Sequence, residues 1–145
     1  MVKSGYFIYE NNMAVGRPSL VGGFAFPGAL VGNYPDCMEN ATAPFDIRAG
    51  RKSEVWIMDG KLLPDIYDSD PDACRQGRIL TEQSYKSLRQ RYMDLCINTP
   101  AERYLNLIRR HPQIEQDIPQ KWIAKYLQIS PVHLCRIRKE QMKQQ

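Results

Sequence analysis

The sequence predicts an α+β fold in which short strands come first, a long helix follows and a helix-turn-helix ends the chain. Three observations support this prediction. Apolar and alternating runs fill residues 5–60, the apolar period becomes helical after Gly60, and residues 118–140 contain two short amphipathic stretches around a tight turn. The length of 145 residues suits one medium domain or two small ones. We expect three units, at residues 1–68, 69–98 and 99–145.

The first unit contains runs typical of short strands, bounded by turn signals at Asn11-Asn12, Pro27-Gly28 and Asp59-Gly60. The predicted strands are Gly5–Glu10, Leu20–Phe26, Val31–Tyr34, Phe45–Ala49 and Glu54–Met58. Strands at this spacing are typical of a β-sandwich or jelly roll. So few strands do not close such a structure. We therefore expect that part of it is missing or that another chain completes it.

The second unit is predicted to be one long helix. A short helix at Lys61–Tyr67 precedes it, and Asp70-Pro71 supplies an N-cap and a first helical position for a helix that runs to about Asn98. Its apolar residues recur at spacings of three and four, as in a coiled-coil seam: Tyr85, Leu88, Tyr92 and Leu95. A helix of roughly 25 residues is about 37 Å long. This length favours a dimerisation helix, and packing on the chain's own β-structure is the alternative.

The third unit begins with a capping box, Thr99-Pro100-Ala101-Glu102, in which the threonine caps the helix and the glutamate reaches back to it. The helix carries an apolar stripe at Tyr104, Leu105 and Ile108 and ends at His111-Pro112. Ile114–Ile118 is predicted to be a short linker, for which an extended backbone is one option. It leads into the segment Ile118–Glu140.

Two short helices are predicted within Ile118–Glu140. The first begins at Pro119 and buries an apolar stripe formed by Trp122, Ile123, Tyr126 and Leu127. The second begins with Ser130 as N-cap and Pro131 at the first helical position, and its inner side carries Leu134 and Ile137.

The turn between these helices favours a helix-turn-helix, although an ordinary αα-hairpin is the alternative. Ala124 is small enough to let the second helix approach the first closely. Gln128 occupies the turn position often taken by glycine, so we expect a left-handed backbone conformation there.

Charge is unevenly distributed along the chain. The net charge is +4, but residues 99–145 hold nine Lys and Arg against four Asp and Glu, a net of +5, and the remainder has a net of −1. A basic C-terminal third beside a nearly neutral remainder is typical of a nucleic-acid-binding unit attached to another unit. A solvated basic face is the alternative reading of the charge alone.

The composition argues against several classes of protein. At 43% hydrophobic and 25% charged residues the chain is ordinary globular material, and no apolar run approaches the ~20 residues of a membrane span. The N-terminus does not have the pattern of a secretory signal peptide, so we expect a cytoplasmic location. No enzyme is indicated, because the two histidines, His111 and His133, both lie in the basic third and have no partner at catalytic spacing.

The four cysteines are widely scattered, at Cys37, Cys74, Cys96 and Cys135, without the close pairs of metal sites. This spacing also argues against an iron–sulfur cluster. We therefore expect buried free thiols, no metal and no cofactor.

The order of these elements resembles the Crp/Fnr family of bacterial transcription regulators, and the resemblance covers nearly the whole chain. It is most specific in Thr99–Leu105 and Ile123–Arg138, and it is also visible in Gly23–Gly28 and Ser53–Met58. The sequence is most similar to the subgroup common in Bacteroidetes. The resemblance implies a partial β-roll of the cyclic-nucleotide-binding-domain type, a dimerisation helix and a winged-type helix-turn-helix. It also implies that the first strands of the roll are lacking, as in a truncated member or a fragment.

The family's nucleotide pocket can be compared residue by residue. Members that bind cyclic AMP carry Gly-Glu-Leu after a β-turn and Arg-Ser about ten residues later, where the glutamate holds the ribose and the arginine neutralises the phosphate. Here the corresponding positions are Gly32-Asn33-Tyr34 and Ala43-Pro44, without either charged group. Because burying a phosphate without a cation is costly, we expect no cyclic-nucleotide binding by this route.

For DNA, the resemblance assigns base readout to Pro131, Val132, Cys135 and Arg136. Arg136 is the strongest candidate, as a fork that donates to guanine, and Val132 is placed for a thymine methyl. Phosphate contacts are assigned to Ser130, His133, Arg138 and Lys139. Lys121 and Lys125 are either additional phosphate contacts or plain solvated cations.

The expected function is thus a dimeric, sequence-specific DNA-binding regulator that acts on a two-fold symmetric operator. The implied partners are double-stranded DNA, a second copy of the chain and, as a further candidate, RNA polymerase, while the effector is unknown. The alternative is a small-molecule-binding β-roll module with a vestigial DNA-binding unit.

Overall fold

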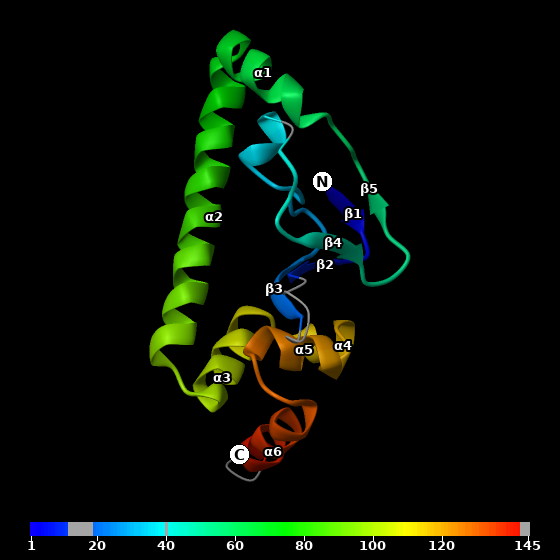
Figure 1. The fold of residues 1–145 in the computed structure, drawn as a ribbon, viewed down its shortest axis with the longest axis vertical. Coiled ribbons are helices and arrows are strands. Elements are labelled where there is room, and N and C mark those ends of the chain that lie inside the picture. The colour runs from blue at the N-terminus through cyan, green and yellow to red at the C-terminus, as the bar shows by residue number, and fades with distance from the viewer. Residues whose placement is uncertain (12–18, 40, 143–145) are drawn as a thin grey trace.

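The computed structural model describes residues 1–11, 19–39 and 41–142. A small β-structure occupies the N-terminal half, a long helix runs along one side of it, and four further helices lie at the far end of that helix (Figure 1). Of the predicted Asn11-Asn12 turn, Asn12 lies outside the described residues.

The described strands form two small antiparallel sheets. β2 (Phe7–Asn11) lies between β3 (Leu20–Ala25) and β4 (Asp46–Ala49), and β1 (Val2–Ser4) pairs with β5 (Glu54–Val55). The predicted strand at Glu54–Met58 is thus only two residues long. It ends where Trp56 exchanges backbone hydrogen bonds with Met1, at N–O distances of 2.8 and 2.9 Å. Four of the five predicted strands are confirmed, with shifted ends.

The predicted strand at Val31–Tyr34 is wrong. This segment is irregular and leads into a 3-10 turn, η1 (Asp36–Met38). The backbone N–H of Gly32 donates to the Tyr9 hydroxyl at 3.3 Å, and Asn33 donates to the Asp36 carboxylate at 3.2 Å. A side chain therefore satisfies the backbone N–H of Gly32, which a neighbouring strand would otherwise pair with.

The chain after the sheets is helical. A 3-10 turn, η2 (Gly60–Leu62), continues into α1 (Leu63–Ser69), and α2 spans Pro71–Ile97. The Asp70 carboxylate accepts hydrogen bonds from the N–H groups of Asp72 and Ala73, which confirms the predicted N-cap. A Cβ atom at Gly77 would lie 2.7 Å from the Tyr67 ring, so glycine is what lets α1 pack closely against α2.

The middle of α2 stands apart from the rest of the chain. Residues 80–90 are all exposed, on every side of the helix. This exposure argues against the alternative that α2 packs along its whole length on its own β-structure.

The C-terminal part contains α3 (Pro100–Arg110), α4 (Ile114–Asp117), α5 (Gln120–Leu127) and α6 (Pro131–Met142). The capping box is confirmed: the Thr99 hydroxyl accepts from the N–H of Glu102, and the Glu102 carboxylate accepts from the N–H of Thr99 at 2.8 Å. The linker predicted at Ile114–Ile118 is wrong, because α4 occupies Ile114–Asp117 and both Ile114 and Ile118 are buried. This single helical turn places the two residues, four apart, on one face against the core.

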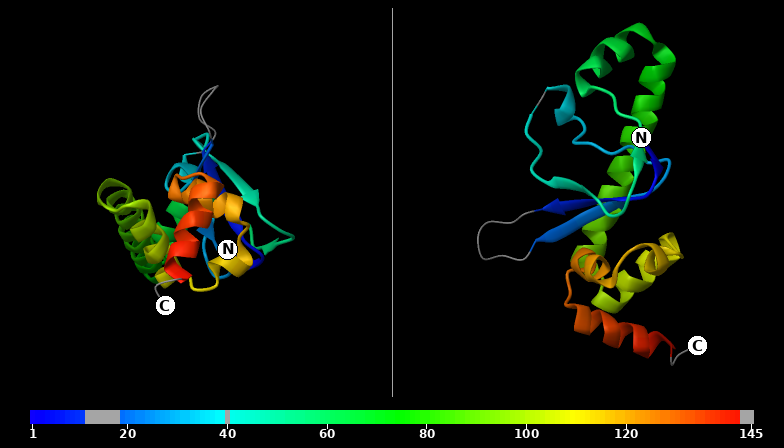
Figure 2. Two further views of the ribbon diagram at one scale, coloured as in Figure 1. Left: turned by 90° about the horizontal axis from the view of Figure 1, so that it is seen from below. Right: turned by 90° about the vertical axis from the view of Figure 1, so that its right-hand side faces the viewer.

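The sheet and the helical part share one hydrophobic core. Tyr6, Ile8 and Val21 contribute from the β-structure, and the helical part contributes Tyr104, Leu107, Ile114, Ile118, Ile123, Ala124, Leu127, Leu134 and Ile137. Figure 2 shows the β2–β3 pair lying directly over this helical layer. The three expected units therefore follow the order of the elements, and the first and third are joined by continuous packing.

Two further features bear on the sequence expectations. No strand follows α6 as far as residue 142, where the described part of the chain ends, so a wing is not among the described elements. None of the described helices is both long and apolar enough to cross a membrane.

Candidate nucleic-acid interface

The turn between α5 and α6 is built as a helix-ending motif around Gln128. This residue has φ 56° and ψ 46°, which confirms the predicted left-handed conformation. The N–H of Ile129 donates to the carbonyl of Ala124 at 3.0 Å, and the N–H of Gln128 donates to the carbonyl of Lys125 at 3.2 Å. These are the two bonds of a Schellman motif, which ends one helix sharply and lets the next begin three residues later.

The second helix begins as the sequence predicts. The Ser130 hydroxyl accepts a hydrogen bond from the N–H of His133 at 3.1 Å. Leu134 and Ile137 are buried in the shared core, and Ala124 is buried beneath them in α5. The segment is thus a helix-turn-helix in which one side of α6 is fixed by packing.

The opposite side of α6 is exposed. Val132, Cys135, Arg136 and Lys139 are spaced three, one and three residues apart and so share one helical face, and all four are exposed. Ser130 and Pro131 are exposed at the start of the helix, and His133 is half-buried beside them. The structure therefore brings together all four residues assigned to base readout and three of the four assigned to phosphates.

Arg138 is placed differently. Its Nε lies 2.8 Å from the Glu115 carboxylate, which also accepts a hydrogen bond from the Tyr104 hydroxyl at 3.0 Å. Burial and the nearby Glu115 charge raise the pKa of Tyr104 to about 12. The guanidinium of Arg138 thus ties α6 to α4 within the protein, and a phosphate contact is not its evident role. Sequence reasoning missed this because Glu115 lies in a segment expected to be a linker.

Lys125 is half-buried and is paired within the protein. Its ammonium group donates to the Glu10 carboxylate at 3.1 Å and to the Ser19 hydroxyl at 2.6 Å, linking α5 to the sheet. Burial alone would raise the pKa of Glu10, but the hydrogen bonds from Lys125 and Ser19 outweigh it and the pKa lies below its usual value. Lys121 remains exposed, with its ammonium group 5.0 Å from the Trp122 ring centroid.

Gly32, Asn33, Tyr34, Ala43 and Pro44, which correspond to the family's effector pocket, lie in the segment between β3 and β4. All five are exposed or half-buried, and none has a charged side chain. They contribute to neither of the two cavities described for this structure.

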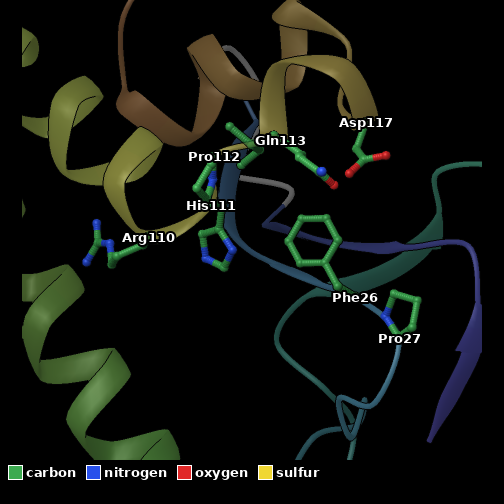
Figure 3. Close-up of a pocket in the computed structure, with 8 residues that line it drawn as sticks. Phe26, Pro27, Arg110, His111, Pro112, Gln113 and Asp117 are labelled. Carbon is green, nitrogen blue, oxygen red and sulfur yellow. The ribbon is translucent and has the colours of Figure 1, made fainter.

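The larger of these cavities has a volume of about 550 Å³ and lies between the end of β3 and the α3–α4 corner (Figure 3). Its walls are formed by Phe26, Pro27, Arg110, His111, Pro112, Gln113, Ile114 and Asp117. The rings of Phe26 and His111 lie 5.4 Å apart, and burial with the nearby Arg110 charge lowers the pKa of His111. Nothing in the sequence marks this site, since its residues come from two distant turns.

The apolar stripe of α2 faces solvent. Tyr85, Leu88 and Tyr92 are 66%, 69% and 64% exposed, and Leu95 is half-buried. All four cysteines are free thiols, but Cys74, Cys96 and Cys135 are exposed and Cys37 is half-buried, so the expectation of buried thiols is wrong.

The comparisons with known proteins are structural. No protein-family model and no curated protein matches the sequence. FixK2 from Bradyrhizobium japonicum superimposes with a TM-score of 0.84 at 16% identity, covering 99% of this chain and 74% of that one. A protein from Eubacterium rectale assigned to the Crp/Fnr family of transcriptional regulators gives 0.73 at 16%, covering 99% and 68%.

The c-di-GMP-responsive global regulator CLP from Xanthomonas campestris is a third similar structure. It superimposes with a TM-score of 0.70 at 17% identity, covering 99% of this chain and 76% of that one. At such identities the likeness shows a shared fold. In all three cases it extends over the β-structure, the long helix and the helix-turn-helix together.

Proposed function

We propose that this chain, which has the fold of the Crp/Fnr transcriptional regulators, is a sequence-specific DNA-binding regulator and not an enzyme. The observation that carries the proposal is the exposed face of α6. Val132, Cys135, Arg136 and Lys139 project from it, while Leu134 and Ile137 fix the opposite side in the core. A helix held in this way can enter the major groove without unfolding any part of the protein.

The chemistry of this face supports a division of roles. Arg136 presents a planar fork that matches O6 and N7 of guanine, and Val132 offers a methyl surface to thymine. Pro131 and Cys135 add contact area and little hydrogen bonding. Lys139 at the end of this face, and Ser130 and His133 beside it, are placed for phosphates, in a C-terminal third with a net charge of +5.

We propose a homodimer joined through α2. An isolated helical segment in water is only marginally stable, yet residues 80–90 are all exposed, on every side of the helix. The exposed stripe of Tyr85, Leu88 and Tyr92 has the spacing of a coiled-coil seam. A second copy would cover it. The dimer should then prefer a two-fold symmetric site whose halves lie about 34–36 Å apart.

A gel-shift series at two salt concentrations tests the proposal. We expect binding to DNA selected from a random pool to survive scrambled competitor and to weaken steeply with salt, because phosphate contacts release counterions. Binding that competitor abolishes completely would mean that α6 reads no sequence.

We propose that cyclic nucleotides are not the effector. Neither segment of the corresponding pocket supplies the carboxylate or the guanidinium that would hold the ribose and the phosphate. Isothermal titration should show no binding of cyclic AMP or cyclic GMP, and micromolar affinity for either would contradict this proposal.

A second candidate function is that of a small-molecule-binding β-roll module, for which the open pocket of about 550 Å³ between the end of β3 and the α3–α4 corner is a candidate site. Its volume lies within the range of roughly 300–1,000 Å³ found for ligand sites. In this reading the DNA-binding unit is vestigial, and the gel-shift series separates the two functions. A cytoplasmic location and an interaction with RNA polymerase accompany the regulator proposal.

A further inference from the structure

The C-terminus of α5 is capped by two arginines from other helices. A helix leaves its last four carbonyl groups without partners in the helix. In α5 the turn itself satisfies the carbonyls of Ala124 and Lys125. The Arg91 guanidinium, from α2, donates to the carbonyl of Tyr126, and the Arg103 guanidinium, from α3, donates to that of Leu127 at 3.1 Å. Two cations therefore lie at the negative end of the α5 dipole, where they are favourable.

Arg91 also stacks on the side chain whose carbonyl it binds. Its guanidinium carbon lies 3.7 Å from the centroid of the Tyr126 ring. Phe24, from β3, packs against the same ring with the two centroids 5.4 Å apart. Tyr126 thus contacts the long helix through Arg91 and the sheet through Phe24.

The neighbouring residue makes a second link to the sheet. Lys125 binds Glu10, which is 4% exposed, and Arg48 lies 3.3 Å from the other carboxylate oxygen. Breaking such a buried pair leaves an uncompensated charge, so this contact resists separation of α5 from β2. The α5 helix is consequently attached at adjacent residues to both the sheet and the proposed dimer helix.

We propose that Arg91 is a positioning residue that sets the angle between the dimer helix and the helix-turn-helix, and thereby the half-site spacing that the dimer accepts. The inference rests on the proposed DNA-binding function. In a two-fold dimer the two copies of α6 are separated by a distance that depends on how each helix-turn-helix is oriented on its α2. Arg91 contacts both the backbone and the ring of α5, so it constrains that orientation directly.

The test compares Arg91→Met, which keeps an unbranched apolar stem but removes the guanidinium, with Arg91→Lys, which keeps the cation, in the 145-residue chain. Arg89→Met is the matched control, because Arg89 lies two residues away on α2 and is exposed. Each protein is assayed by gel shift on the selected operator and on versions whose half-sites are moved by one to three base pairs. Arg91→Gln is a second variant for use if circular dichroism shows that Arg91→Met is not folded.

A second readout needs no DNA. Spin labels on the exposed thiols Cys74 of α2 and Cys135 of α6, with Cys37 and Cys96 replaced by serine, report the distance between the two helices. Excess unlabelled protein isolates the distance within one protomer.

The proposal predicts that Arg91→Met loses about three- to tenfold in affinity on the preferred spacing and much of its discrimination against the others. The distribution of its label-to-label distances should broaden. Arg91→Lys, which keeps the charge but lacks the planar guanidinium, should be intermediate, and Arg89→Met should remain close to wild type. Unchanged spacing preference and unchanged distances in Arg91→Met would overturn the proposal. If the wild-type chain selects no DNA, the proposed function fails, and the label distances alone decide whether Arg91 positions α5.

Discussion

The carboxylate of Asp94 lies 2.7 Å from the guanidinium of Arg110, in an ion pair that joins the end of α2 to the end of α3. Asp94 is 1% exposed and also accepts hydrogen bonds from the side chains of Gln90, Asn98 and Asn106. One buried carboxylate therefore holds the corner at which the proposed dimer helix meets the helix-turn-helix unit. The helix-turn-helix unit is therefore attached to α2 in two places, at this corner and through the contacts of α5.

We expect Asp94→Asn to lower the free energy of unfolding by about 2–3 kcal/mol. The substitution leaves the Arg110 cation without its carboxylate, and it points the new amide N–H₂ group at side chains that themselves donate hydrogen bonds. Because Arg110 is partly exposed, water can solvate its charge, so the cost lies below that of breaking a fully buried pair. Urea unfolding at one protomer concentration measures the change. Asp68→Asn, on the exposed side of α1, is the control and should change little.

The same carboxylate should make stability depend on acid. Burial alone would raise the pKa of Asp94, but the hydrogen bonds from Arg110 and Gln90 prevail and lower it. A carboxyl group whose pKa is lower in the folded state than in the unfolded state stabilises the fold. This contribution is complete above the pKa of the unfolded state, about 3.9, and is lost as the pH falls through the pKa of the folded state. The stability difference between wild type and Asp94→Asn should therefore shrink below about pH 4, and a constant difference down to pH 2 would contradict this account.

The sequence predicts the features of this molecule that depend on local spacing. The Asp70 cap, the capping box at Thr99 and the left-handed Gln128 each follow from residues within four positions of one another, and each is confirmed. The helix-turn-helix follows from the same kind of pattern, because its two short helices bury residues at helical spacing.

The long-range charge pairs could not be predicted in this way. Glu10 and Lys125 are 115 residues apart in the chain, and each alone reads as an ordinary solvated charge. Their pairing depends on the packing of α5 over the sheet, which no local pattern encodes. The wrong strand at Val31–Tyr34 has a related cause, since the Tyr9 hydroxyl, from a distant strand, satisfies the N–H of Gly32.

Dimerisation through α2 predicts a strong effect of a charge in its apolar stripe. Leu88→Glu would bury an unpaired carboxylate between the helices, which costs about 3–5 kcal/mol and raises the dimer dissociation constant a hundredfold or more. Sedimentation velocity over a range of protein concentrations measures the shift. Gln83→Glu adds the same charge on the other side of α2 and should leave the dimer intact. If both variants remain dimeric, the stripe does not form the dimer contact.

The left-handed turn offers a stabilising substitution. A non-glycine residue in this conformation costs roughly 1–2 kcal/mol, and glycine removes that cost. Because glycine also makes the unfolded chain more flexible, which favours unfolding, Gln128→Gly should raise the free energy of unfolding by only about 0.5–1 kcal/mol. The matched change Gln83→Gly, in the middle of α2, should instead lose about 1 kcal/mol. Thermal unfolding of both variants and of wild type measures whether each substitution stabilises or destabilises the protein. A loss of stability in Gln128→Gly would show that the Gln128 side chain itself stabilises the fold.

Arg136 is the side chain on which the proposed readout depends most, because it is the only arginine on the exposed face of α6 among residues 131–142. Arg136→Ala should lose about 1–3 kcal/mol of binding free energy on the preferred operator and accept any base at one position of each half-site. Competitive binding to operators with single base changes measures both effects. Arg89→Ala removes an equal charge from α2 and should lower affinity only slightly, without changing the base preference. Uniform weakening of Arg136→Ala across all operators would instead identify Arg136 as a phosphate contact, and base recognition would then rest on the smaller side chains around it.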